Sequence, residues 1–299
     1  MSKLEEMAKK LDLAAIPNVD FDAYMNASKD DNQKIKRVSE YIDELEDFIN
    51  SGDQVSGTQF PFAKLHSLFG FRDSEVTLWT GYNGHKKSMM LGFVVLKSFL
   101  ATQERTCIAS FEMKPVKTIT RMVRQFSYTS NPADTDYANF IDFAADKLYI
   151  LDQMGGMTPQ RLYGVITYCA KELGIKHFVI DSLMRVIAGE DDHNAQKDFI
   201  VKLCEISNAT GIHIHIVHHT KKGDENKPSG RYDAKGSGAI SDNVHNSITV
   251  WANKNKLKDM PDVILTCDKQ REGEWEGRIA LNFDSQTLNF TESFGGASA

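Results

Sequence analysis

The sequence has few of the residues that build disulfide frameworks, metal clusters and membrane spans. Its 299 residues include four cysteines and seven prolines. Cys107, Cys169, Cys204 and Cys267 lie far apart, without the C-x-x-C spacing of a zinc or redox site, so we expect free, mostly buried thiols. No apolar run reaches the ~18 residues of a membrane helix, and charges interrupt the amino-terminal segment where a signal peptide would be apolar. We therefore expect a cytoplasmic protein with no membrane partner.

An excess of basic residues is also missing. The chain has 41 acidic and 35 basic residues, which gives a net charge of -6. This balance excludes a surface built as a whole to coat nucleic acid, so any contact with DNA must be local. With 41% hydrophobic and 25% charged residues, the composition is that of a globular protein with enough apolar material for a large core.

The first 53 residues differ in pattern from the rest. Residues 1–32 are polar and irregular, which predicts a flexible arm with at most one short helix. Apolar residues then recur at steps of three and four, as on one face of an amphipathic helix: Ile35, Val38, Ile42, Leu45 and Ile49. A lone helix has no core of its own, so this stripe needs a partner surface, either on its own domain or on a neighbouring subunit. We divide the chain into an arm with a linker helix, 1–53, and a main domain, 54–299.

Short apolar β-rich runs alternate with stretches of helical length in the main domain. The runs are EVTLWT (75–80), TCIAS (106–110), KLYIL (147–151), HFVI (177–180) and HIHIV (213–217). This alternation is typical of βαβ units and a mostly parallel sheet. After Gly238 the strand candidates follow one another closely, as SITVWA, DVILTCDKQ, GRIALNF and TLNF, which predicts antiparallel strands. The sequence thus predicts an α/β fold with a mostly parallel central sheet extended by antiparallel strands.

A glycine-containing loop links the first of these strands to an apolar helix. The loop reads GYNGHKKS, from Gly81 to Ser88, and strand, loop and helix in this order are the context of a P-loop. In such a loop, backbone N–H groups and a helix N-terminus surround phosphates, a lysine reaches the β and γ oxygens, and a hydroxyl binds Mg²⁺. We predict a site for ATP or another NTP with Mg²⁺, formed by Gly81, Gly84, His85, Lys86, Lys87 and Ser88.

The loop departs from the P-loop pattern at one position, because Lys86 stands where glycine usually precedes the lysine. Glycine there allows unusual dihedral angles and close approach of the backbone to phosphate. Three interpretations stay open: a working natural variant, a change that weakens nucleotide binding, and a loop with a purely structural role.

Three further residues at strand ends could complete a phosphate site. Asp181 follows HFVI and is placed to bind Mg²⁺, Glu112 follows TCIAS and is placed to activate water, and His219 follows HIHIV and is placed to contact a γ-phosphate. The carboxyl ends of parallel strands meet at one edge of a sheet, so residues far apart in sequence come together there. A strand-end Asp can also be a helix cap, and a lone Glu is often only solvated.

Six motifs in order resemble the DnaB-type replicative helicases, including the helicase half of phage primase-helicases and their mitochondrial relatives. They are GYNGHKKS, SFEM, VIDSL, IVHHTKK, KGSGAI and DKQR, and they span roughly residues 54–290. The resemblance implies a RecA-like ATPase, with phosphate and Mg²⁺ roles for Lys87, Ser88 and Asp181, water activation by Glu112 and γ-phosphate sensing by His219. It also implies that Lys269 and Arg271 act on the nucleotide of a neighbouring subunit.

The resemblance further implies a homo-oligomeric, hexameric ring on single-stranded DNA, with a primase or a loader as a further partner. The segment HTKKGDENKPSGRYDAKGSG carries five basic residues that we predict to bind DNA: Lys221, Lys222, Lys227, Arg231 and Lys235. A solvated loop without a ligand is the alternative. No primase region precedes the main domain, so we expect either a reduced phage or mobile-element helicase or an excised fragment. A RecA-like DNA-binding ATPase without unwinding activity, such as a loader or mediator, remains the second hypothesis.

Overall fold

The computed structural model describes residues 37–51, 55–187, 192–220, 224–227, 238–255, 257 and 260–293. The chain divides into two compact units, Met1–Gln54 and Val55–Ala299. In the first unit, a 3-10 turn, Val38–Tyr41, leads into helix α4, Ile42–Ser51. Val38, Leu45 and Ile49 of the predicted apolar stripe are exposed, whereas Ile35 lies outside the described residues.

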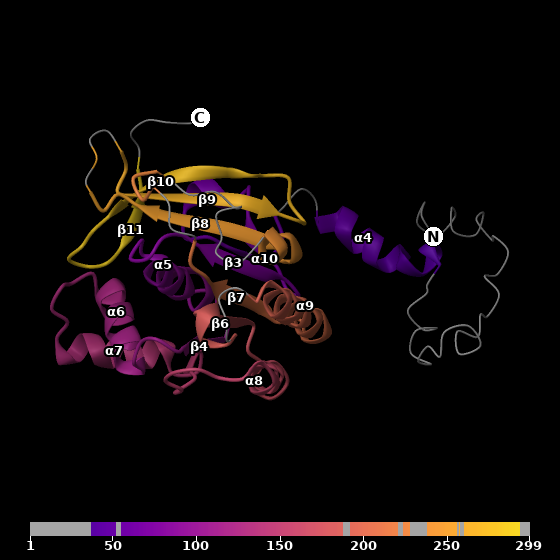
Figure 1. Ribbon diagram of the computed structural model, residues 1–299, viewed down its shortest axis with the longest axis horizontal. Coiled ribbons are helices and arrows are strands. Elements are labelled where there is room, and N and C mark those ends of the chain that lie inside the picture. Colours follow the sequence, from indigo (N-terminus) through magenta and orange to yellow (C-terminus); the bar gives the residue numbers. More distant parts are fainter. Residues whose placement is uncertain are drawn as a thin grey trace. The chain divides into compact units, whose positions relative to one another are not determined.

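A nine-stranded sheet forms the centre of the second unit (Figure 1), in the order β11-β10-β9-β8-β3-β7-β6-β4-β5. The parallel strands are β3 (Val76–Thr80), β4 (Thr106–Ser110), β5 (Leu148–Ile150), β6 (His177–Asp181), β7 (His213–Val217) and β8 (Asn246–Ala252). The antiparallel extension consists of β9 (Val263–Gln270), β10 (Gly277–Phe283) and β11 (Phe290–Glu292). The predicted fold class is therefore confirmed.

One strand differs in direction from the sequence pattern. The close spacing of the late strand candidates predicted that SITVWA is antiparallel, but β8 runs parallel to β3, and the antiparallel part begins at β9. A separate two-stranded sheet pairs β1 (Thr58–Gln59) with β2 (Gly70–Phe71), and 3-10 turns form at Ala63–Leu65 and Leu183–Arg185.

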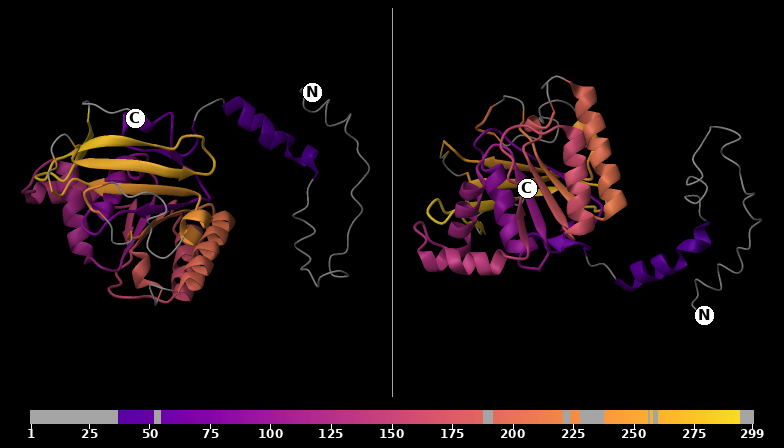
Figure 2. Two further views of the ribbon diagram at one scale, coloured as in Figure 1. Left: turned by 45° about the horizontal axis from the view of Figure 1, so that its top comes forward. Right: turned by 90° about the horizontal axis from the view of Figure 1, so that it is seen from below.

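Helices cover both faces of the central sheet, as the right-hand view of Figure 2 shows. One face carries α5 (Lys87–Val94), α6 (Pro115–Ser127) and α7 (Asp134–Ala144). Helix α5 continues directly into a π-helical turn, Val95–Phe99. The other face carries α8 (Pro159–Glu172), α9 (His193–Thr210) and α10 (Gly238–Asn243). Alternate residues of the central strands enter the two cores, which explains why these strands are apolar throughout. Among the described residues, no helix is both long and apolar enough to span a membrane.

A chain of hydrogen bonds runs through two histidines buried in the sheet. The indole of Trp79 donates to His215 Nδ1 (3.3 Å), so the other nitrogen of His215 carries the hydrogen and donates to His177 Nδ1 (3.2 Å). His177 Nε2 in turn donates to Glu104 (3.1 Å), and the Phe99 ring stacks on the His177 ring. This arrangement requires both imidazoles to be neutral, and burial lowers the pKa of each.

Candidate functional site

The predicted phosphate loop lies between β3 and α5, at the carboxyl edge of the parallel strands. Lys87 is the first residue of α5 and its Nζ donates to the carbonyl oxygens of Gly81 and Tyr82, both at 2.8 Å. A Cβ on Gly81 would lie 2.2 Å from the Val250 carbonyl oxygen of the adjacent strand β8, so only glycine fits where the loop leaves the sheet. The loop is therefore packed tightly against β8.

Lys87 is only 4% exposed. Burial lowers the pKa of its ammonium group to about 8, against the opposing effect of the carboxylates of Asp181 and Glu112. This arrangement suits the binding of a phosphate together with a metal ion. The ammonium group compensates negative charge on the phosphate, and the carboxylates compensate the positive charge of the metal ion.

Lys86 has a backbone conformation that favours glycine. Its φ of 67° and ψ of 17° are left-handed, and it stands at the N-cap of α5. Its side chain leaves the loop toward the antiparallel extension, where Nζ lies 4.1 Å from the centroid of the Phe283 ring. The Lys86 side chain therefore packs on β10.

Ser88 and Asp181 lie together although they are far apart in the sequence. The Ser88 hydroxyl hydrogen-bonds the Asp181 carboxyl group at the end of β6. Burial raises the pKa of Asp181, and Glu112 adds to this effect, whereas Lys87 and Arg121 oppose it. A hydroxyl and a carboxylate are oxygen ligands of the kind that Mg²⁺ prefers, so these side chains fit the predicted metal role.

Glu112 lies beside this pair, because the ends of β4 and β6 are joined by a hydrogen bond from the backbone N–H of Phe111 to the Asp181 carbonyl oxygen (2.8 Å). The Ser182 hydroxyl donates to Glu112 Oε1 (2.9 Å), and Arg185 Nε lies 3.4 Å from the same oxygen. Sequence reasoning did not identify Ser182 or Arg185. Their position directly after the strand that ends at Asp181 is the signal that could have identified them.

His219 lies in the segment that follows β7 and runs along the phosphate loop. The neighbours of His219 fix this path: the backbone N–H of His218 donates to the Trp79 carbonyl oxygen (2.8 Å), and that of Thr220 donates to the Gly81 carbonyl oxygen (3.1 Å). The structure thus brings the predicted residues Lys87, Ser88, Glu112, Asp181 and His219 to one edge of the sheet.

The imidazole of His85, a predicted nucleotide-binding residue, faces the sheet. His85 is fully buried, its Nδ1 accepts from the backbone N–H of Ala252 (3.1 Å), and its Nε2 faces Glu225 at 3.5 Å. Burial lowers the pKa of this imidazole. The His85 side chain thus holds the phosphate loop on β8.

Lys254, which sequence reasoning missed, braces the tip of the same loop. Its Nζ donates to the Asn83 carbonyl oxygen and to Glu225 Oε2, both at 3.2 Å, and the Trp251 indole donates to the Glu225 carbonyl oxygen (2.9 Å). Nothing in the local sequence marks Lys254. It reaches the loop because β8, which ends just before it, lies next to β3.

Lys269 and Arg271 lie at the opposite edge of the sheet. Lys269 pairs with Ser247 near the start of β8, and the backbone N–H of Arg271 donates to the His245 carbonyl oxygen. His245 in turn pairs with Val76, five residues before the phosphate loop, which corresponds to about 17 Å along a strand. The structure therefore does not bring Lys269 and Arg271 to the phosphate loop of their own chain.

The side chains of this pair contact the end of α10. Lys269 Nζ donates to the carbonyl oxygens of Ser241 (3.0 Å), Asp242 (2.8 Å) and Val244 (2.7 Å), and Arg271 Nη2 donates to that of Asp242 (3.3 Å). The last carbonyl oxygens of a helix have no intrahelical partner, so they accept hydrogen bonds readily from positively charged side chains.

Of the five residues predicted to bind DNA, only Lys227 lies within the described part of the chain. It is exposed, and its Nζ is 3.8 Å from the Asp224 carboxylate. Lys221, Lys222, Arg231 and Lys235 fall outside the described residues.

Comparisons with known proteins agree with this architecture. A family model described as an AAA domain matches residues 55–225. A solved structure described as an ATPase domain superposes with a TM-score of 0.76 at 15% identity, over 87% of this chain and 99% of that one. A DnaB-like replicative helicase, solved in a study of its interactions with primase, superposes with a TM-score of 0.72 at 16% identity, over 86% of this chain and 67% of that one. No curated protein matches. At these identities the likeness to the solved structures is one of fold, and the family match shows that the chain belongs to the AAA domain family, here with a RecA-like sheet.

Proposed function

We propose that the chain is an ATP-driven motor that moves along single-stranded DNA as a ring, of the type found in replicative DNA helicases. The observation that carries the proposal is the division of the predicted groups between two edges of one sheet. The residues predicted to bind phosphate and metal lie at the carboxyl edge, whereas the Lys269/Arg271 pair lies at the amino edge, about 17 Å away along the strands.

The groups at the carboxyl edge fit ATP with Mg²⁺. The buried ammonium group of Lys87 would bind the β and γ oxygens, while the Ser88 hydroxyl and the Asp181 carboxylate would hold the metal ion, which neutralises phosphate charge. Glu112, held by Ser182, would orient and deprotonate the attacking water. His219, next to the phosphate loop, would contact the γ-phosphate.

The position of Lys269 and Arg271 supports action between subunits. An arginine finger must contact the phosphates that react, and a cation at the far edge of the sheet can do so only at a neighbour's site. This requirement favours a closed homo-oligomer, a hexameric ring in our proposal, with ATP bound between subunits. The exposed apolar residues of α4 would dock on the adjacent subunit.

The stretch from residue 219 to 237 would contact DNA. It begins at the phosphate loop with His219 and carries Lys221, Lys222, Lys227, Arg231 and Lys235. A local cluster of basic side chains in an acidic chain suits binding to the phosphate backbone without sequence preference. A primase or a loader would be the further partner.

The test combines ATP hydrolysis with a measurement of size. We expect single-stranded DNA to stimulate hydrolysis and the chain to assemble into a ring with ATP, Mg²⁺ and DNA. Glu112→Gln is expected to abolish hydrolysis while nucleotide binding persists. A chain that stays monomeric with all three ligands present, as measured by light scattering, contradicts the ring and the role of Arg271.

A second candidate function is a RecA-like DNA-binding ATPase that does not unwind DNA, such as a loader, a mediator or an impaired ring subunit. Lys86 at the glycine position of the loop is the observation in its favour. Displacement of a labelled strand from a forked duplex separates the two candidates: hydrolysis and DNA binding without strand displacement support the second.

A further inference from the structure

Gln270 stands between Lys269 and Arg271 at the end of β9, and its side chain is almost completely buried, with 5% exposed. Successive side chains of a strand point to opposite faces. Lys269 and Arg271 both contact the end of α10, whereas Gln270 contacts groups on the other side of the strand. The middle residue of this segment is thus fixed independently of the two cations that flank it.

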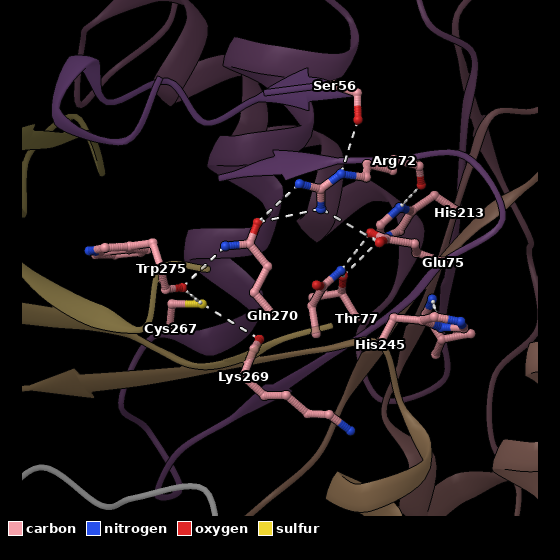
Figure 3. Close-up of polar contacts among 12 residues, drawn as sticks. Ser56, Arg72, Glu75, Thr77, His213, His245, Cys267, Lys269, Gln270 and Trp275 are labelled. Atoms are coloured by element: carbon pink, nitrogen blue, oxygen red, sulfur yellow. Dashed lines mark hydrogen bonds and ion pairs between the residues drawn. The ribbon is translucent and has the colours of Figure 1, made fainter. Parts of the chain in front are cut away.

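The amide of Gln270 has both of its ends bonded (Figure 3). Its Oε1 accepts from Arg72 Nη1 (3.4 Å) and Nη2 (3.3 Å), and its Nε2 donates to the carbonyl oxygen of Trp275 (3.1 Å). The same Nε2 also donates to the carbonyl oxygen of Leu68 (3.0 Å). A guanidinium group can only donate and a carbonyl oxygen can only accept, so these partners permit one orientation of the amide. Three neighbouring segments therefore hold one side chain.

Arg72 is itself held in place. Its Nε donates to the Ser56 hydroxyl (3.0 Å), and its Nη1 lies 3.6 Å from the carboxylate of Glu75, which is buried. The amide of Asn246, at the start of β8, donates to the same carboxylate (2.8 Å). This network joins Gln270 to the centre of the sheet, so its position is fixed relative to β3 and β8 (Figure 3).

The turn after Arg271 folds over the same amide. A Cβ on Gly273 would lie 2.2 Å from Cδ, 2.4 Å from Oε1 and 2.5 Å from Nε2 of Gln270, so a larger residue at 273 would displace the Gln270 side chain. Trp275, two residues later, supplies one of the acceptor carbonyls. The Gln270 amide thus contacts the turn at Gly273 and at Trp275. Arg271 is the first residue of this turn.

We propose that Gln270, supported by Arg72, is the positioning residue that sets the location and reach of the Lys269/Arg271 pair for action on a neighbouring subunit. This inference rests on the proposed function. An arginine finger is useful only when its guanidinium group meets the reacting phosphate within a fraction of an ångström, so the backbone that carries it must be rigid. The buried amide provides that rigidity on the face of β9 opposite to the two cations.

Mixed assemblies of the full-length chain test this role. Glu112→Gln chains cannot hydrolyse ATP in their own site but offer an intact Arg271, whereas Arg271→Ala chains have an intact site and no finger. Each is expected to be inactive alone, and mixing them is expected to restore DNA-stimulated hydrolysis. Donor chains that carry both Glu112→Gln and Gln270→Leu are expected to restore a hydrolysis rate about tenfold lower than that restored by Glu112→Gln donors. This loss is small beside the roughly 10³- to 10⁵-fold increase in kcat that an arginine finger contributes.

A second readout does not depend on turnover. Gln270→Leu is expected to weaken the binding of a non-hydrolysable ATP analogue to the assembled ring, and to add nothing to this loss in chains that already carry Arg271→Ala. Such non-additivity is the mark of a residue that acts through another. A Gln270 side chain that only stabilised the fold would lower the melting temperature but would weaken analogue binding equally in both backgrounds.

Gly273→Ala gives an independent variant that keeps every polar side chain of the network, and it replaces Gln270→Leu if that chain does not fold. Gly164→Ala in α8, where an added Cβ meets nothing within 4 Å, is the matched control and should leave restoration unchanged. Full restoration by Gln270→Leu or Gly273→Ala donors that assemble normally overturns the positioning role. Failure of the Glu112→Gln donor itself to restore hydrolysis instead refutes the action between subunits, and with it this proposal.

Discussion

Replacing Lys86 tests whether the unusual residue of the phosphate loop is tolerated because of its backbone and its packing. In the left-handed region, an L-residue is about 1–2 kcal/mol less stable than in the right-handed region, whereas glycine is not penalised. The contact between Lys86 Nζ and the Phe283 ring, at 4.1 Å, contributes about 0.5–2 kcal/mol in return. Glycine also loses about 0.4–1 kcal/mol through the greater freedom of the unfolded chain.

These terms predict that Lys86→Gly is more stable than Lys86→Ala. Lys86→Gly relieves the strain but loses the contact and gives the unfolded chain more freedom, so these terms place its stability between about 1 kcal/mol above and about 2 kcal/mol below that of the parent. Lys86→Ala keeps the strain and loses the contact, so it should be less stable by about 0.5–2 kcal/mol, which corresponds to about 2–4 °C of melting temperature per kcal/mol in a unit of this size. In a Phe283→Leu background the cost of Lys86→Ala should nearly vanish.

Thermal melting of the four single and double variants, followed by circular dichroism, measures these differences. ATP hydrolysis by Lys86→Gly provides the second assay, and we expect little change because the Lys86 side chain packs on β10. Two results refute the reasoning. One is a melting temperature of Lys86→Gly that is equal to or lower than that of Lys86→Ala. The other is a tenfold or greater gain in the turnover of ATP by Lys86→Gly, which would identify the loop with Lys86 as impaired.

Three further predictions follow from the contacts around the sheet. The buried imidazoles of β6 and β7 have lowered pKa values, so the unfolded chain binds protons below pH 6.5 that the folded chain does not. Stability is therefore expected to fall as the pH drops from 7 toward 5, and a flat melting profile over this range contradicts their neutral, buried state. Ser182→Ala should lower turnover about tenfold while nucleotide affinity changes little, since Glu112 loses the hydroxyl that orients it; equal losses in turnover and affinity would argue against this role. Lys254→Met should raise the Kd for ATP, measured with a fluorescent analogue, because the loop tip at Asn83 loses its brace; an unchanged Kd would show that the brace is dispensable.

The fold and the centre of the candidate site could be predicted from the sequence because both depend on strand ends. Apolar runs of five residues separated by helical lengths predict parallel strands, and parallel strands bring their carboxyl ends to one edge. Lys87, Ser88, Glu112 and Asp181 each follow such a run, so their approach in space could be expected from the chain alone. The direction of β8 could not, because the segment before it gives no clear helical pattern.

The groups that hold the site in place escaped prediction for a different reason. Lys254 and Arg185 act through contacts across neighbouring strands, and their own sequence surroundings are ordinary. His85 shows the reverse: its place in the loop motif predicted a contact with nucleotide, but its ring faces β8. A motif fixes where the backbone of a residue lies, whereas the direction of its side chain depends on the strand that happens to be adjacent.

The arrangement of β3, β8 and β9 links the two edges of the sheet mechanically. The phosphate loop leaves β3 and is packed on β8 through Gly81 and His85, while β8 pairs over its full length with β9, which ends in the segment that contains Gln270. A sheet buried on both faces changes shape little, so the distance between the phosphate loop and Arg271 of the same chain is set by strand length. In the proposed ring, a signal from bound nucleotide to a neighbouring subunit would move the sheet as a body or act through α10, whose carbonyl oxygens accept hydrogen bonds from Lys269.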